Sequence, residues 1–435
     1  MLDNLVAAAI VGALYLAYRF FVQRKTAAPA PVTVEEKKPA EYRFGTVTPL
    51  ADYDVRALKA TKPQAYRPFR HGPVYPQHMG IRNITDQNTW LQLDNLYSDI
   101  LSIRTRRTHD PSIVSSLTQP GFHAHALEAL VEIASFLSTR FPKLFKVTRT
   151  PYVAGDETTY GDSVVGKEGG AIVAIENCVT GQKWDLREIE EKEGPEWNPM
   201  AIAGQLTQDD LAVMVEREDG HYCFQAGSIC TAGFWRIKDK IGLTLDDIHF
   251  KGAVPNYAEK YQKSMNRFFT NLREDKLVER NNYFFQVDES YDWSVKTNGT
   301  ESIFDQFAKG NQAGMAEKTP GAVAPTAATD VRQVRFRTER QSLRRLPRSR
   351  AILFTIRTYL IPVVDLANEP GVPGRMASGI RSWPTQGDIN VAWYKGAELY
   401  TPVLLPFLDE KHDEQVKNGT IIVDEQGKTP ENYPY

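Results

Sequence analysis

Apolar residues recur at helical spacing in the first part of the chain and alternate with polar ones later. Apolar spacing and capping residues predict helices over 88–106, 123–139, 207–216 and 257–272. The third helix is expected because Thr207 has the chemistry of an N-cap and Asp209 would lie in the positive first turn. The spacing therefore predicts that helices come early.

Runs rich in β-branched and aromatic residues follow, and such runs favour strands. The expected strands cover 171–175, 221–224, 282–287 and 351–361. Because the helices precede strands of antiparallel type, the pattern predicts an α+β fold, with an antiparallel sheet and flanking helices.

The first 45 residues have a different pattern from the rest. Residues 5–18 carry no charge, and with 20–22 they give roughly 18 apolar positions, just enough to cross a bilayer. Positive charges follow this run instead of preceding it, which favours an anchor over a cleaved signal peptide. The sequence thus predicts one transmembrane helix within residues 1–25, with the rest of the chain facing the cytosol. We expect a single-pass protein of the endoplasmic reticulum membrane.

The remaining chain divides by composition. Residues 26–45 are rich in Pro and Ala and predict a linker, and 46–435 are expected to form the functional domain. A low-complexity stretch at 308–330 predicts a flexible insertion in that domain.

Composition narrows the class of partner and cofactor. The net charge is -2 over 435 residues, which argues against a nucleic-acid binder. The three cysteines are too few for an ordinary iron–sulfur cluster, and an odd count fits a reducing compartment.

Arginine is concentrated between positions 331 and 360, where nine Arg and no Lys occur and Glu339 is the single acid. Arg is favoured where a planar, bidentate donor must meet carboxylate or phosphate. The pattern predicts a strand over 334–338, a short helix over 339–346 and then the strand over 351–361. The alternative interpretation is a set of surface salt bridges.

Familiar catalytic motifs are missing, because the sequence contains no Walker loop, G-x-G-x-x-G, G-x-S-x-G or H-E-x-x-H. His123 and His125 lie two apart near a helix start, so they are expected to point in different directions and to be ordinary histidines. His249 is the better candidate, since it sits in a turn-rich, apolar segment before a Gly and a Pro. A hydrogen-bonded structural histidine is the alternative there.

Two further patterns suggest a luminal enzyme. Asp52-Tyr-Asp54 resembles the Asp-x-Asp of sugar-nucleotide transferases, but it is a single short motif. Asn83, Asn298 and Asn418 begin glycosylation sequons, which matter only in a luminal domain.

Several short motifs run in a fixed order through about residues 65–405. They are Gln208-Asp-Asp-Leu211, Cys230 with Trp235, Lys240-Ile-Gly242, Ile248-His249, Val254-Pro255, Arg280-Asn-Asn-Tyr283, Glu339-Arg-Gln341, Arg345-Leu-Pro347 and Phe354-Thr-Ile-Arg-Thr-Tyr359. Together they resemble the fungal HRQ family, which is related to the α subunit of haem-dependent oxidative N-demethylase. The chain departs from that family in three places. Ala232-Gly-Phe234 precedes Trp235, where the family usually has Pro before its Trp, and Ala253 and Tyr283 stand where proline and tryptophan are usual.

The resemblance implies a PAS-like domain that holds haem b and oxidatively removes a methyl group from a small amine. It makes His249 the expected axial ligand and metal-binding residue. The arginine run would supply propionate partners, with Arg337, Arg340 and Arg345 as candidates, whereas Glu339 and Gln341 would act on oxygen or amine. An internal Arg337–Glu339 pair is the structural alternative.

Three functions are compatible with the sequence. The first is a membrane-anchored haem-dependent oxygenase, which would need a separate reductase because the chain has no flavin or nicotinamide fingerprint. The second is a PAS-like module that binds haem or a small molecule without turnover. The third is a luminal glycosyltransferase. A visible spectrum of the purified protein separates the first two from the third.

Overall fold

A computed structural model describes residues 44–69, 79–153, 162–165, 169–189, 192, 194–305, 312–385 and 390–428. Within these ranges a seven-stranded antiparallel sheet is the largest element, with strands in the order β1-β8-β9-β10-β6-β7-β2. The strands are β1 (Arg82–Asn83), β2 (Ser116–Thr118), β6 (Asp209–Glu216), β7 (Tyr222–Ser228), β8 (Leu277–Gln286), β9 (Arg335–Arg345) and β10 (Ile352–Pro362). A second, three-stranded sheet contains β3 (Phe145–Arg149), β4 (Ile172–Asn177) and β5 (Gln182–Asp185).

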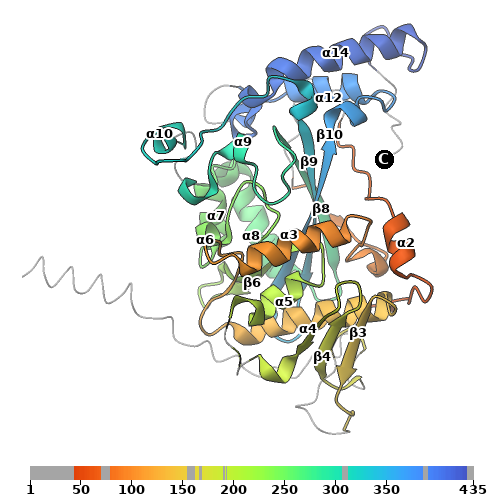
Figure 1. Cartoon of the computed structure of the whole chain (residues 1–435), viewed down its shortest axis with the longest axis vertical. Coiled ribbons are helices and arrows are strands. Elements are labelled where there is room, and N and C mark those ends of the chain that lie inside the picture. The colour runs from red at the N-terminus through yellow and green to blue at the C-terminus, as the bar shows by residue number, and fades with distance from the viewer. Residues whose placement is uncertain are drawn as a thin grey trace, which may run out of the picture. The chain divides into compact units, whose positions relative to one another are not determined.

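Helices pack on both faces of the large sheet and at one of its ends (Figure 1). Those that precede β8 are α2 (Val55–Ala60), α3 (Tyr97–His109), α4 (His123–Arg140), α5 (Pro199–Gly204), α6 (Ile237–Lys240), α7 (Leu245–Lys251), the π-helical turn η5 (Tyr257–Tyr261) and α8 (Gln262–Asn271). Those that follow β8 are α9 (Val295–Asn298), α10 (Gln312–Glu317), α11 (Val363–Leu366), α12 (Val372–Arg381), α13 (Val391–Tyr394) and α14 (Thr401–Lys417).

The sheet register divides the residues of β9 between two faces, because successive side chains of a strand point in opposite directions. On one face, Leu343 joins an apolar cluster with Ile237 of α6, Leu245 of α7 and Phe269 of α8. On the other face, α3 and α4 pack beside Leu353 of β10 in a larger cluster. Elements α11, α12 and α14 cover Phe336 and its neighbours at the end of the sheet.

The predicted short helix at 339–346 is wrong. These residues continue β9, which pairs with β10 from Arg335 to Arg345 and with β8 from Arg335 to Arg344. Good helix formers do not decide the outcome here, since two neighbouring strands satisfy the backbone of β9 on both sides.

The predicted helix at 207–216 is also wrong, because Asp209–Glu216 forms β6 between β10 and β7. Thr207 donates its hydroxyl to Asp209 Oδ2 at 2.8 Å instead of capping a helix. The run from Leu211 to Val215 is buried throughout, and a strand covered on both faces has no polar alternation to reveal it.

Most of the other predicted elements are present. The helix expected at 123–139 is α4, the strands at 171–175 and 351–361 are β4 and β10, and the helix at 88–106 begins later, at Tyr97. The strands at 221–224 and 282–287 are within β7 and at the end of β8, and the helix at 257–272 is η5 followed by α8. Of the segment 308–330, residues 308–311 lie outside the described residues and the rest includes α10. The domain division therefore stays a prediction.

The fold prediction is corrected in one further respect. No helix in the part of the chain that the structure describes is long and apolar enough to cross a membrane. The predicted anchor at 1–25 lies outside the described residues. We therefore replace the PAS-like sheet preceded by a transmembrane helix with a mixed fold of helices and a large antiparallel sheet, and we withdraw the single-pass endoplasmic reticulum localisation.

The buried pair between Arg344 and Glu132 predicts a large stability effect. The Arg344 Nη2 to Glu132 Oε2 distance is 2.8 Å, and both side chains are almost fully buried. We expect Glu132→Gln to lower the free energy of unfolding by about 3 kcal/mol, because the guanidinium stays charged and buried. Urea unfolding measures this loss. The exposed pair Arg381–Asp409 is the control, and Asp409→Asn should cost less than about 1 kcal/mol. Equal losses in the two variants would contradict the prediction.

Candidate functional site

The predicted site residues of β9 do not all lie together. The register between β9 and β8 places Arg337 opposite Phe284, Glu339 opposite Asn282 and Gln341 opposite Arg280. These odd-numbered positions of β9 share the face covered by α6, α7 and α8. Arg345 lies on the same face, further along the strand, whereas Arg340 points to the opposite face. The structure therefore brings Glu339 and Gln341 together and separates Arg340 from them.

Arg340 and Arg345 are fully engaged by protein groups. Arg340 Nε lies 2.7 Å from Glu279 Oε2, and its two other nitrogens donate to the carbonyls of Trp90 and Thr89. Arg345 donates to Tyr222 Oη at 2.9 Å and to the backbone carbonyls of Leu272, Arg350 and Phe269. Arg340 thus joins β9 to β8 and to residues 89–90, and Arg345 joins β9 to β7 and to the end of α8.

Arg337 is buried and makes no ion pair with a described residue. It donates to the backbone carbonyl of Thr231 and to Gln286 Oε1 at 3.1 Å, and its Nε has no partner. Burial lowers the pKa of its guanidinium. Glu339 forms no salt bridge with it, so the internal pair considered from the sequence is not made.

Glu339 begins a chain of polar contacts along this face. Gln341 Nε2 donates to Glu339 Oε2 at 2.8 Å, and Arg280 Nη1 donates to Gln341 Oε1 at 2.6 Å. Glu339 and Gln341 are 5% and 6% exposed, so the contacts are shielded from solvent. A carboxylate that is buried without a cation in contact is costly, which makes Glu339 a candidate partner for a ligand.

His249 lies on α7, which covers this face of the sheet. Its Nδ1 is 2.7 Å from the Leu245 carbonyl one turn earlier, so Nδ1 carries the hydrogen and Nε2 keeps a lone pair. The imidazole also stacks on Tyr257, with centroids 4.6 Å apart and planes 9° apart. Burial lowers the pKa of His249 to about 4, so the ring is neutral at pH 7. A neutral histidine oriented by a carbonyl is the form that binds a metal.

Two cations act on His249 and Glu339 electrostatically. Lys240 and Arg280 both lower the pKa of His249, and Glu339 raises that of Lys240. Burial is the larger effect at Lys240 and lowers its pKa to about 8. The contacts among Arg280, Gln341 and Glu339, and the electrostatic influence of these residues on Lys240 and His249, relate five residues on one face of the sheet. We call Lys240, His249, Arg280, Glu339 and Gln341 the α7–β9 site.

Half-buried apolar side chains from the helices and the sheet pack against the apolar cluster on the same face as the α7–β9 site. They are Trp235, Ile248, Met265, Phe268 and Phe354. Lys240 Nζ lies 3.8 Å from the centroid of the Trp235 ring. An apolar surrounding with a few convergent polar groups is typical of ligand sites.

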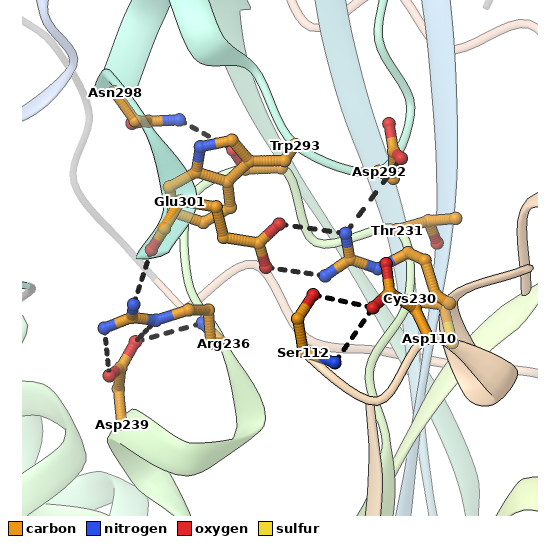
Figure 2. A network of polar contacts seen from close by, with 12 residues as sticks. Asp110, Ser112, Cys230, Thr231, Arg236, Asp239, Asp292, Trp293, Asn298 and Glu301 are labelled. Carbon is orange, nitrogen blue, oxygen red and sulfur yellow. Dashed lines mark hydrogen bonds and ion pairs between the residues drawn. The ribbon is translucent and has the colours of Figure 1, made fainter. Parts of the chain in front are cut away.

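The loop that carries Trp235 is fastened by residues from a distant part of the chain. Figure 2 shows Arg236 bound to Asp239, with Nη2 to Oδ1 at 2.7 Å, and donating to the Glu301 carbonyl at 2.6 Å. Asn298 Nδ2 donates to the Gly233 carbonyl at 2.7 Å. This network holds the Trp235 loop against the segment after β8.

Gly233 is required by the close approach of Arg337. It has a φ of +76°, and a Cβ there would lie 2.7 Å from the Arg337 guanidinium carbon. Any larger residue would displace either the loop or the buried guanidinium.

The other candidates from the sequence have structural roles. Asp54 caps α2 by accepting from two backbone N–H groups, and Asp52 is exposed. Asn298 uses its amide nitrogen in the loop network, which argues against glycosylation there. His125 is buried, and no group of three or more metal-binding side chains was found among the described residues.

Sequence reasoning missed Lys240, Arg280 and Tyr257 as members or neighbours of the site. Lys240 and Arg280 belong to two of the short motifs that carry the family resemblance. Only the register of β8 with β9, however, brings Arg280 to Gln341. The stacked Tyr257 had no signal in the sequence, since it depends on the angle between α7 and η5.

A comparison with protein families identifies a relationship over most of the chain. The family model described as haem-dependent oxidative N-demethylase, alpha subunit-like, matches residues 80–405. That range contains all five residues of the α7–β9 site. The narrower resemblance to the fungal HRQ family stays a prediction.

The residues present fit a haem group on the chemistry of their donors. His249 offers Nε2 with its tautomer fixed, the surrounding side chains are apolar, and Lys240 and Arg280 are cations beside them. Haem needs these three things, namely an axial ligand, an apolar surface and partners for two propionates.

The low pKa of His249 predicts a loss of stability in acid. The unfolded histidine binds a proton below its ordinary pKa of 6.5, whereas the folded one does so only near 4. Stability from this group is therefore complete above pH 6.5 and is lost as the pH falls toward 4, by on the order of 2 kcal/mol. Urea unfolding of haem-free protein at pH 7 and pH 4.5 measures it. The pH dependence should be shallower in His249→Gln, and an unchanged dependence would contradict the assignment.

Proposed function

We propose, from the premise that this chain belongs to the haem-dependent oxidative N-demethylase, alpha subunit-like family, that it is a haem-dependent oxygenase removing a methyl group from a small amine. The proposal rests on the Nε2 atom of His249, which belongs to a neutral, oriented imidazole beside apolar side chains and can donate its lone pair to a metal. We further propose that the group is haem b.

In this proposal His249 is the axial ligand. The Leu245 carbonyl fixes the tautomer and Tyr257 fixes the plane of the ring. A carbonyl acceptor on the second nitrogen also makes the imidazole a stronger donor to a metal. Haem, when bound, supplies the activation of oxygen, and the chain supplies the orientation of ligand and substrate.

Lys240 and Arg280 are the better propionate partners among the cations of the site. Both lower the pKa of His249, and Arg280 does so while it donates Nε to the Met79 carbonyl and Nη1 to Gln341 Oε1. Arg340 points to the opposite face, and Arg345 donates to Tyr222 and to backbone carbonyls. Of the arginines considered from the sequence, Arg337 keeps an unpartnered Nε, but its other nitrogens bind carbonyl and amide oxygens.

Glu339 and Gln341 are proposed to act on the substrate. A small amine is protonated at pH 7, and a buried carboxylate without an ion pair is its natural partner. Gln341 fixes Glu339 Oε2 and is itself fixed by Arg280, so the carboxylate would meet the amine in one orientation. Glu339 would then hold the ammonium and accept its proton as the amine becomes neutral.

The axial ligand is tested by absorbance. We expect wild-type protein produced with haem to show a Soret band, and His249→Ala to lose it, because no second donor stands at that position. His123→Ala is the matched control and should keep the band, since His123 lies on α4, outside the site. A missing band in the wild type would overturn the haem assignment, and a retained band in His249→Ala would overturn the ligand.

The role of Glu339 is tested by substitution with its neutral amide. We expect Glu339→Gln to keep the Soret band and to raise KM for an amine at least tenfold, because the ammonium loses its charged partner. Turnover of trial dimethylamines with a chemical reductant measures this. Glu279→Gln is the control on the opposite face and should leave KM unchanged. An unchanged KM in Glu339→Gln would remove the carboxylate from substrate binding.

A further inference from the structure

One exposed face beside the α7–β9 site carries cations without acidic partners. Lys260 of η5 and Lys263 and Arg267 of α8 are spaced by three and four residues, so they project from the same side of the helix. All three are exposed, and none forms an ion pair with a described residue. Glu259, four residues before Lys263, is the single acid within η5 and α8, so the three cations outnumber it on this surface.

An exposed aromatic ring contacts η5, the element that carries Lys260. Phe250, at the end of α7, is 47% exposed, and its ring meets that of Tyr257 edge to face with centroids 5.1 Å apart. Burying that ring would be favourable, so its exposure needs a reason. An apolar ring with charged residues around it has the anatomy of a small interface.

The rings connect this surface to the site. Phe250 contacts Tyr257, and Tyr257 stacks on His249 at 4.6 Å. Asp246 holds the arrangement by accepting from Tyr257 Oη at 2.7 Å and from Gln262 and Asn266 of α8. His249 and Phe250 both lie on α7, and Asp246 ties α7 to η5 and to α8. Figure 1 shows α7 and α8 on the same side of the sheet.

We propose that the face formed by Phe250, Lys260, Lys263 and Arg267 docks an acidic electron-transfer protein. The inference rests on the proposed function, because a haem oxygenase without flavin or cluster must receive electrons from another protein. The reduced donor would give up one electron and be oxidised, and a ferric haem held by His249 would take up that electron. No bond forms in this transfer.

The positive charge of this face indicates what kind of partner protein would bind it. A partner that binds briefly for electron transfer needs only a small interface, and opposite charge speeds its encounter. Three unpaired cations on a chain of net charge -2 favour an acidic partner over a neutral one. A nucleic acid would need a larger basic surface than this face provides.

The test uses the full-length holoprotein and a plant-type [2Fe–2S] ferredoxin as the acidic probe. Binding is measured by titration calorimetry at 20 mM and 300 mM salt, and reduction by the rate of the Soret shift. We expect wild-type binding that weakens at high salt. The triple variant K260E/K263E/R267E should lose at least tenfold in affinity and in the reduction rate by ferredoxin. Phe250→Ala should weaken binding without changing its salt dependence.

The controls separate this proposal from the proposed function. The variant K318E/K417E/K428E makes the same change in net charge at exposed positions elsewhere and should behave as wild type. Reduction by dithionite should be equal in all variants. A wild type that neither binds nor is reduced by ferredoxin overturns the docking face, and so does equal loss in both triple variants. Absence of a Soret band overturns the proposed function, while calorimetry still decides the docking face.

Discussion

The arginine side chains of the central strand β9 are buried, and the rest of the structure depends on how they are accommodated. β9 is eleven residues long and lies between β10, which pairs with all of it, and β8, which pairs with it as far as Arg344. Its arginines must therefore leave the strand on one of two covered faces. Isolated buried charge is prohibitive, and each guanidinium has to find acceptors in the layer that covers it. The helices and loops around the sheet are positioned by these requirements.

The two faces meet the requirement differently. On the face under α3 and α4, Arg340, Arg344 and Arg357 each contact a carboxylate. On the other face, Arg337 and Arg345 rely on neutral oxygens, and no carboxylate of the described residues is within ion-pair distance of either. Glu339 lies between them without a salt bridge. The first face thus uses its charges for stability, whereas the second leaves a carboxylate and a set of donors that a ligand would complete.

How far the sequence predicted this arrangement depends on the kind of information needed. Helix α4 and strand β10 follow from local pattern, because the periodicity of each matches its environment. β6 was missed because a strand buried on both faces does not alternate, and the capping chemistry of Thr207 then favoured a helix. Alternation correctly placed Arg337 and Glu339 on the same face. It could not show that Arg337 turns to Thr231, because that contact joins residues 106 positions apart in the chain.

The site combines elements that local sequence cannot relate. His249 comes from α7, Arg280 from β8 and Glu339 from β9, and the Trp235 loop is held by a segment after β8. Only the packing of α7 against the sheet relates them. Because α7 is also tied to η5 and α8 through Asp246, any movement of the histidine must move the exposed face around Phe250 as well. A partner bound to that face would therefore bear directly on the orientation of His249, through contacts between rings and without a change in the sheet.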